Sequence, residues 1–149
     1  MGLLEELAVR CEAATGADRE LDCLIWAEVT EQKVVWTGGD GHLLVIGDSA
    51  IGSIDPGKHS RNFSCNRQPT GPGSIPAYTG SLEAGRSIWD DWDHCEVYRP
   101  DHQTLGWTVH MYGNANAWRG SVDGFAPTEA AAWTAASLRG LALSKGSDT

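Results

Sequence analysis

Residues 73–85 concentrate side chains that could hold an anion. Tyr78, Thr79 and Ser81 supply three hydroxyl groups at the start of a helix predicted over residues 80–90. The first backbone N–H groups of a helix lack partners within it and attract anions. The pattern therefore indicates a site for a small anionic ligand. The alternative is structural: Thr79 caps the helix and Tyr78 packs in the core.

Positive charge gathers just before this helix. Residues 56–80 carry Lys58, Arg61 and Arg67 and no Asp or Glu, whereas the formal net charge of the whole chain is −9. A cationic segment on an acidic protein suits a small polyanion better than a long nucleic acid, which needs an extended basic surface. If the segment covers the helix start, it completes the site; the alternative is a solvated loop whose charges balance the acidic remainder.

The chain has seven tryptophans, more than a core of this size needs. We assign Trp36 to the ligand, where it would stack on a base, and packing is the alternative for this side chain. The predicted ligand residues are thus Tyr78, Thr79, Ser81, Lys58, Arg61, Arg67 and Trp36.

A second cluster is acidic and lies in the stretch WDDWDHCE. Asp90, Asp91, Asp93, His94 and Glu96 offer ligands for a divalent cation, but their spacing matches no EF-hand or HExxH pattern. A solvated acidic turn at the C-terminus of the preceding helix is the stronger interpretation. Acids there oppose the helix dipole, which suggests an edge that faces a protein partner. The sequence therefore predicts no metal site and no cofactor.

Catalytic motifs are missing from the sequence. We find no GxSxG element, P-loop or dinucleotide fingerprint. Residues 47–52 superficially resemble the GDS block of hydrolases but lack its position near the N-terminus and its Asp-x-x-His partner. We predict no catalytic residue, and a hydrolase that uses Ser49 or His110 remains a minor alternative.

Composition limits the class of protein. A chain of 149 residues with 41% hydrophobic content predicts a single domain over residues 1–149. No apolar run is long enough to cross a bilayer, and the first ten residues resemble an acid-bearing amphipathic helix rather than a signal peptide. We therefore expect a cytoplasmic protein whose four cysteines, Cys11, Cys23, Cys65 and Cys95, are reduced and mostly pack in the core.

Hydrophobic periodicity predicts an α+β fold. Helices are expected at about 3–14 and 17–29, a hairpin at 34–46 inside a long irregular excursion over about 30–76, and a third helix at 80–90 with Thr79 as its N-cap. Strands should follow at about 94–99, 104–112 and 118–122, then an alanine-rich helix from Pro127 to Leu143 and a disordered tail from about residue 145.

Three stretches resemble one known family. VRCEAATGADRELDCLIW, IPAYTGSLEAG and FAPTEAAAWTAASLRGL are similar to the opening, the Pro-x-Tyr-Thr-x-Ser-Leu element and the closing alanine-rich helix of the phage ABA sandwich domain. Residues 30–74 and Gly85 depart from the family's pattern. The resemblance implies an α/β/α sandwich, with a small, mostly antiparallel sheet packed by an N-terminal helix pair and the C-terminal helix. It also implies a phage or prophage origin, and no known reaction.

Phage proteins of this size often counter host defences, and by that analogy the expected function is non-catalytic. We expect a protein that sequesters a small nucleotide-derived anion in the host bacterial cytoplasm. The alternative is an inhibitor that binds a host defence protein through an acidic, tryptophan-rich surface. Neither a long nucleic acid nor a membrane is an expected partner, and a homo-oligomer stays open.

Overall fold

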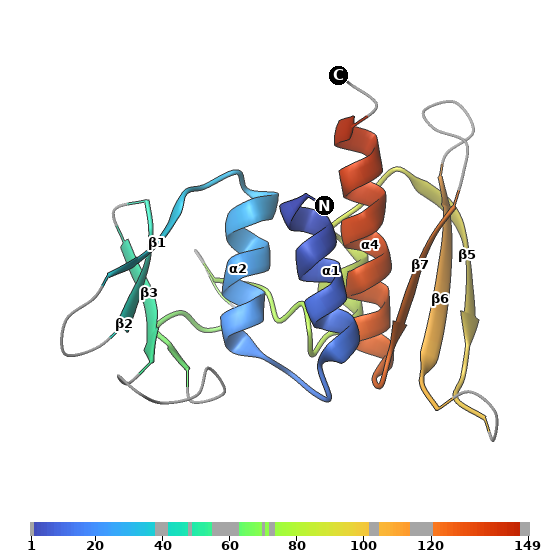
Figure 1. Cartoon of the computed structure of the whole chain (residues 1–149), viewed down its shortest axis with the longest axis horizontal. Helices are drawn as coiled ribbons and strands as arrows, with labels where there is room; N and C mark the ends of the chain where they lie inside the picture. The colour runs from blue at the N-terminus through green and yellow to red at the C-terminus, as the bar shows by residue number, and fades with distance from the viewer. Residues whose placement is uncertain are drawn as a thin grey trace. The chain divides into compact units, whose positions relative to one another are not determined.

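A computed structural model describes residues 2–37, 42–47, 49–54, 63–69, 71, 74–101, 105–113 and 121–146. The chain divides into two compact units, and Figure 1 labels most of their helices and strands. Unit 1 combines Met1–Ala17 with Tyr78–Thr149, and unit 2 consists of Asp18–Ala77. Unit 1 is therefore assembled from both ends of the chain. The single domain expected from the sequence stays a prediction.

Unit 1 is a three-stranded antiparallel sheet with helices on it. The strands β5 (Trp92–Tyr98), β6 (Trp107–Gly113) and β7 (Ser121–Ala126) lie in the order β5-β6-β7. The long helix α4 (Glu129–Gly146) packs on β7 and β6, and α1 (Leu3–Ala13) packs on α4 (Figure 1). The short helix α3 (Leu82–Arg86) contacts α4 as well.

Small residues let α4 lie close to the sheet. Along β7, Val122, Gly124 and Ala126 are buried in alternation with exposed residues, as expected for a strand with one covered face. A Cβ atom on Gly124 would meet the backbone carbonyl oxygen of Ala132 in α4. Glycine at this position is therefore a packing requirement. The remaining core of unit 1 includes Trp89, Val109, Met111, Ala131, Trp133 and Ala136.

Unit 2 packs one helix and a four-stranded antiparallel sheet. Asp18 caps α2 (Arg19–Val29) by accepting a hydrogen bond from the Leu21 N–H at 3.1 Å. The sheet has the order β1-β2-β3-β4. Its strands are β1 (Val34–Thr37), β2 (His42–Ile46), β3 (Ser49–Ile54) and β4 (Ser64–Cys65). The core between helix and sheet contains Cys23, Ala27, Leu44, Ile46, Ile51 and Ile75.

The structure confirms the predicted α+β class. The N-terminal helix pair, the antiparallel sheets and a C-terminal helix that packs against α1 and β7 are all present. The hairpin at 34–46 and the strands near 94–99 and 104–112 are confirmed too.

The structure differs from several predicted boundaries. The expected irregular excursion over about 30–76 contains β3 and β4 in addition to its hairpin, and the last strand spans Ser121–Ala126 rather than 118–122. The third helix covers only Leu82–Arg86, with Ser81 rather than Thr79 as its N-cap. Helix α4 begins at Glu129 rather than at Pro127. The hydroxyl of Thr128, the residue before the helix, accepts a hydrogen bond from the Ala131 N–H. It continues to Gly146, so part of the predicted tail is helical, and residues 147–149 lie outside the described residues.

Candidate functional site

The sheet of unit 1 has one face that α4 covers and one that points away from it, which we call the outward face. The strand register places its side chains in three rows across β5, β6 and β7. Residues that pair directly across antiparallel strands share a face, so each row forms one strip of surface. The rows are Tyr98–Thr108–Phe125, Glu96–His110–Asp123 and His94–Tyr112–Ser121.

Contacts between neighbouring strands order the side chains of the outward face. The His110 imidazole pairs through Nδ1 with the Asp123 carboxylate, and its ring lies edge-on to the Tyr98 ring, with the ring centres 5.6 Å apart. The ring centres of His94 and Tyr112 are 5.3 Å apart. Cross-strand aromatic and charged pairs stabilise a sheet and hold their side chains in place. The outward face is thus an ordered surface.

The outward face combines exposed rings with negative charge. Tyr98 and Phe125 retain 52% and 45% of their accessible surface. The Tyr98 hydroxyl donates to the Glu96 carboxylate at 2.6 Å, and this hydrogen bond, with the nearby negative charge, raises the pKa of the Tyr98 phenol. Asp123 is exposed in the same row as Glu96. Such a surface is suited to contacting apolar and cationic groups together.

The predicted acidic cluster adjoins this face. Asp90, Asp91 and Asp93 are exposed around the start of β5, whereas His94 and Glu96 belong to the outward face itself. Asp93 lies where the register of β5 and β6 shifts between Trp92 and His94. Among the described residues, no group of three or more His, Cys, Asp or Glu side chains is arranged to hold a metal ion.

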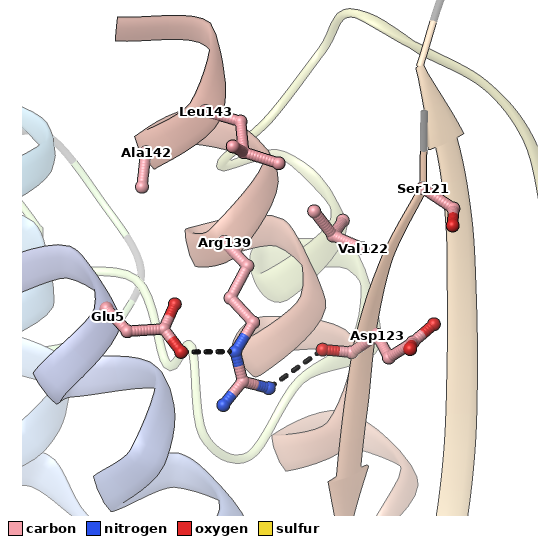
Figure 2. A pocket seen from close by; sticks show the side chains of 7 residues that line it. All are labelled: Glu5, Ser121, Val122, Asp123, Arg139, Ala142 and Leu143. Atoms are coloured by element: carbon pink, nitrogen blue, oxygen red, sulfur yellow. Dashed lines mark hydrogen bonds and ion pairs between the residues drawn. The ribbon is translucent and has the colours of Figure 1, made fainter. Parts of the chain in front are cut away.

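A groove with a volume of about 590 Å³ lies between α1, α4 and β7 (Figure 2). Arg139 is a polar residue of its lining. The Arg139 Nε donates to Glu5 Oε1 at 2.9 Å, and its Nη1 donates to the Asp123 carbonyl oxygen at 2.8 Å. Both Nη atoms also donate to the Glu12 carboxylate. Because two carboxylates already neutralise this guanidinium, the groove is a poor anion site. The lining residues are Glu5, Ser121, Val122, Asp123, Arg139, Ala142 and Leu143.

The hydroxyl-bearing residues predicted to hold an anion are packed into unit 1. Tyr78 is 5% and Thr79 1% exposed, and the Thr134 hydroxyl donates to the Tyr78 carbonyl oxygen. Ser81 accepts a hydrogen bond from the Ala84 N–H at 3.4 Å as the N-cap of α3. The burial of Tyr78 fits the structural alternative, but the helix cap of that alternative is Ser81 and not Thr79.

The other predicted ligand residues belong to unit 2. The Arg67 guanidinium lies 5.6 Å from the ring centre of Trp26. The half-buried ring of Trp36 meets Phe63 edge-on, with the ring centres 6.0 Å apart. Lys58 and Arg61 lie outside the described residues. The seven ligand residues are therefore divided between the two units, and their assembly into one pocket stays a prediction.

The two residues of the minor hydrolase alternative belong to different units. Ser49 begins β3 of unit 2, whereas His110 is in β6 of unit 1. The sequence signal for the outward face was the alternation in β6, where apolar Trp107, Val109 and Met111 interleave with polar residues. That pattern predicts two faces, but it does not reveal which side chains lie beside His110.

Comparison of the chain with family models, curated proteins and solved structures gives no match. The resemblance to the phage ABA sandwich domain, and with it the phage origin, stays a prediction. None of the helices that the structure describes combines the length and apolar character needed to cross a membrane.

Proposed function

We propose that the chain is a non-catalytic binding protein that docks a basic segment of another protein on the outward face of the β5-β6-β7 sheet. The observation that carries the proposal is the exposure of Tyr98 and Phe125 on a face whose neighbouring side chains are ordered by cross-strand contacts. Aromatic residues are enriched at protein interfaces because they bury much area at a small cost in side-chain entropy.

Charge defines the partner. Glu96 and Asp123 lie on the outward face, the three exposed aspartates adjoin it, and the chain has a net charge of −9. A partner with lysine or arginine side chains gains both ion pairs and contacts over the tyrosine rings. A phosphate backbone would be repelled by the same carboxylates.

Affinity capture with a matched pair of variants tests this proposal. Tyr98→Ser/Phe125→Ser removes the two exposed rings, whereas Leu3→Ser/Val9→Ser removes two side chains of α1 with the same exposed fractions, 52% and 45%. We expect a stoichiometric protein partner from bacterial lysate to bind wild type and the α1 variant, to be lost with the ring variant, and to dissociate as salt is raised. Equal capture by both variants, or no stoichiometric partner for wild type, counts against the proposal.

A second candidate function is the binding of a small nucleotide-derived anion by unit 2. Its support is the pairing of Arg67 with Trp26 and of Trp36 with Phe63, which places a cation and partly exposed aromatic rings in one unit. Arginine and aromatic side chains together recognise phosphates and bases. A role in sequestering a host defence signal would be one use of such a site, and it rests on the family resemblance alone.

Thermal unfolding with cyclic dinucleotides and ADP-ribose tests this second candidate. A ligand that binds the native state raises the melting temperature, and the rise should disappear in Arg67→Met but persist in Arg99→Met, which removes an exposed arginine of unit 1. A temperature shift that survives Arg67→Met would place the ligand elsewhere. No shift with any nucleotide at millimolar concentration would exclude these ligands.

A further inference from the structure

Two cysteines of unit 2 that are far apart in the sequence lie side by side in the fold. Cys23 on α2 and Cys65 on β4 have their sulfur atoms 3.5 Å apart. A disulfide bond has a length of about 2.05 Å, so the sulfurs need to approach by roughly 1.5 Å to form one. Both cysteines are free thiols in this structure.

The surroundings of the two thiols differ. Cys65 is half-buried, and Arg19 Nη2 lies 3.5 Å from its sulfur. Cys23 is fully buried, and burial, reinforced by the neighbouring Cys65, raises the pKa of its thiol. Oxidation of a thiol depends on the access of the oxidant to its sulfur. The half-buried sulfur of Cys65 is therefore suited to react first, and the fully buried sulfur of Cys23 is suited to react second.

Arg19 is held in place by several other acceptors. Its Nη1 donates to the buried Asp22 carboxylate at 3.0 Å and to the Pro76 carbonyl oxygen at 3.2 Å, and its Nη2 donates to the Arg67 carbonyl oxygen at 3.0 Å. The Cys65 thiol also donates to that Arg67 carbonyl, at 3.2 Å. The cation is thus fixed beside the sulfur by contacts that do not depend on the thiol.

We propose that Cys23 and Cys65 form a peroxide-sensitive dithiol that closes into a disulfide between α2 and β4. The Cys65 thiolate attacks one oxygen of hydrogen peroxide, the O–O bond breaks, and the departing hydroxide takes a proton to leave as water. The Cys65 sulfenic acid then reacts with the Cys23 thiol, which forms the S–S bond and releases a second water. The two thiols are oxidised by two electrons, and the peroxide is reduced by the same two.

The disulfide would alter unit 2 locally. It ties the short edge strand β4 to α2 across 42 positions of sequence and so restricts the unfolded chain. It also removes the Cys65 thiol from Arg19 and from the Arg67 carbonyl. We expect oxidation to raise the melting temperature by several degrees, and dithiothreitol to reverse the rise.

Peptide mapping of the wild-type protein tests the proposal directly. The four cysteines fall in four different tryptic peptides, with Cys23 in residues 20–33 and Cys65 in residues 62–67. Reduced protein is treated with hydrogen peroxide while native, alkylated with N-ethylmaleimide in denaturant and digested without reductant. We expect the two peptides to appear joined, lighter than their sum by two hydrogen atoms, with Cys11 and Cys95 alkylated.

Single variants separate the two roles. In Cys23→Ser, Cys65 should stop at a sulfenic acid that dimedone traps; in Cys65→Ser, Cys23 should remain alkylatable after peroxide. Cys95→Ser removes the other half-buried thiol and should leave the cross-link unchanged. Recovery of peptides 20–33 and 62–67 separately, whether alkylated or oxidised to sulfinic acids, overturns the proposal. So does oxidation of Cys95 as fast as that of Cys65.

Discussion

The guanidinium of Arg139 on α4 donates to both carboxylate oxygens of Glu12 on α1, from Nη1 at 2.7 Å and from Nη2 at 2.6 Å. The same two residues also form hydrogen bonds with backbone groups on the free edge of β7. Arg139 Nη1 donates to the Asp123 carbonyl oxygen, and the Glu12 carboxylate accepts from the Phe125 N–H. An unpaired strand edge is a site for unwanted strand addition. This ion pair therefore joins two helices and protects the edge of the sheet.

Arg139→Met should lower the free energy of unfolding by about 2–4 kcal/mol, because it leaves the half-buried carboxylates of Glu5 and Glu12 without their cation. Urea denaturation measures the loss. Arg10→Met removes an exposed arginine of α1 and should change stability by less than about 0.5 kcal/mol. Equal effects of the two substitutions would show that the Arg139 network contributes little.

Stability should fall in acid through Glu12. Burial alone raises the pKa of this carboxyl, but hydrogen bonds from Arg139 and Phe125 and the attraction of Arg139 outweigh burial, so the pKa lies below its ordinary value of 4.5. A lowered pKa in the folded state gives stability that is present above the unfolded pKa and lost as pH falls through the folded pKa. The urea midpoint of wild type should therefore drop between roughly pH 5 and pH 3 more steeply than that of Glu12→Gln. Parallel profiles would contradict this.

Gly140→Ala should destabilise unit 1 although it lies within α4. Helix propensity alone favours alanine over glycine by about 1 kcal/mol. A Cβ atom on Gly140, however, would overlap the ring of Trp89, which is 1% exposed and packs in the core of unit 1. We expect a net loss of about 1–3 kcal/mol in thermal or urea unfolding. Gly16→Ala, where a Cβ meets nothing within 4 Å, is the control and should be close to neutral.

Glu96→Gln should lower the pKa of the Tyr98 phenol toward its ordinary value of 10, since the carboxylate that accepts the phenol hydrogen bond causes the rise. Absorbance at alkaline pH measures the titration, and subtraction of the Tyr98→Phe curve isolates this tyrosine. Glu83→Gln in α3 removes an exposed carboxylate away from the outward face and should leave the curve unchanged. An unchanged Tyr98 titration in Glu96→Gln would mean that the hydrogen bond is absent in solution.

Elements with a strong local period could be predicted from the sequence. The alternation from Trp107 to Tyr112, the hairpin of β1 and β2 and the alanine-rich run in α4 could each be identified without knowledge of their neighbours. Strands that contain glycine were missed or misplaced. Gly52 lies in β3 against Phe63 and the backbone of Ser64, and Gly124 lies in β7 against α4. From the local sequence, Gly52 and Gly124 are both typical of loops, and only the tertiary packing shows why glycine is needed at each position.

The candidate sites were harder to predict than the helices and strands, because they are formed by residues that are distant in the sequence. Thr79 and Ser81 are both good N-cap residues, and the burial of Thr79 in unit 1 leaves the capping to Ser81. The outward face exists because the register of β5, β6 and β7 aligns three rows of aromatic, charged and polar side chains. The sulfurs of Cys23 and Cys65 meet only through the pairing of β4 with β3 and its packing on α2. These strand registers and contacts cannot be predicted from the local sequence.

The assembly of unit 1 from both ends of the chain has a consequence for biosynthesis. During translation α1 leaves the ribosome well before its packing partner α4, so the apolar side of α1 stays uncovered while the residues between the two helices are made. Unit 2 has all of its residues by Ala77 and can reach its native state while the ribosome is still adding the sheet of unit 1. A nascent chain arrested before Glu129 would therefore contain all of unit 2 but would lack the helix α4 that unit 1 needs.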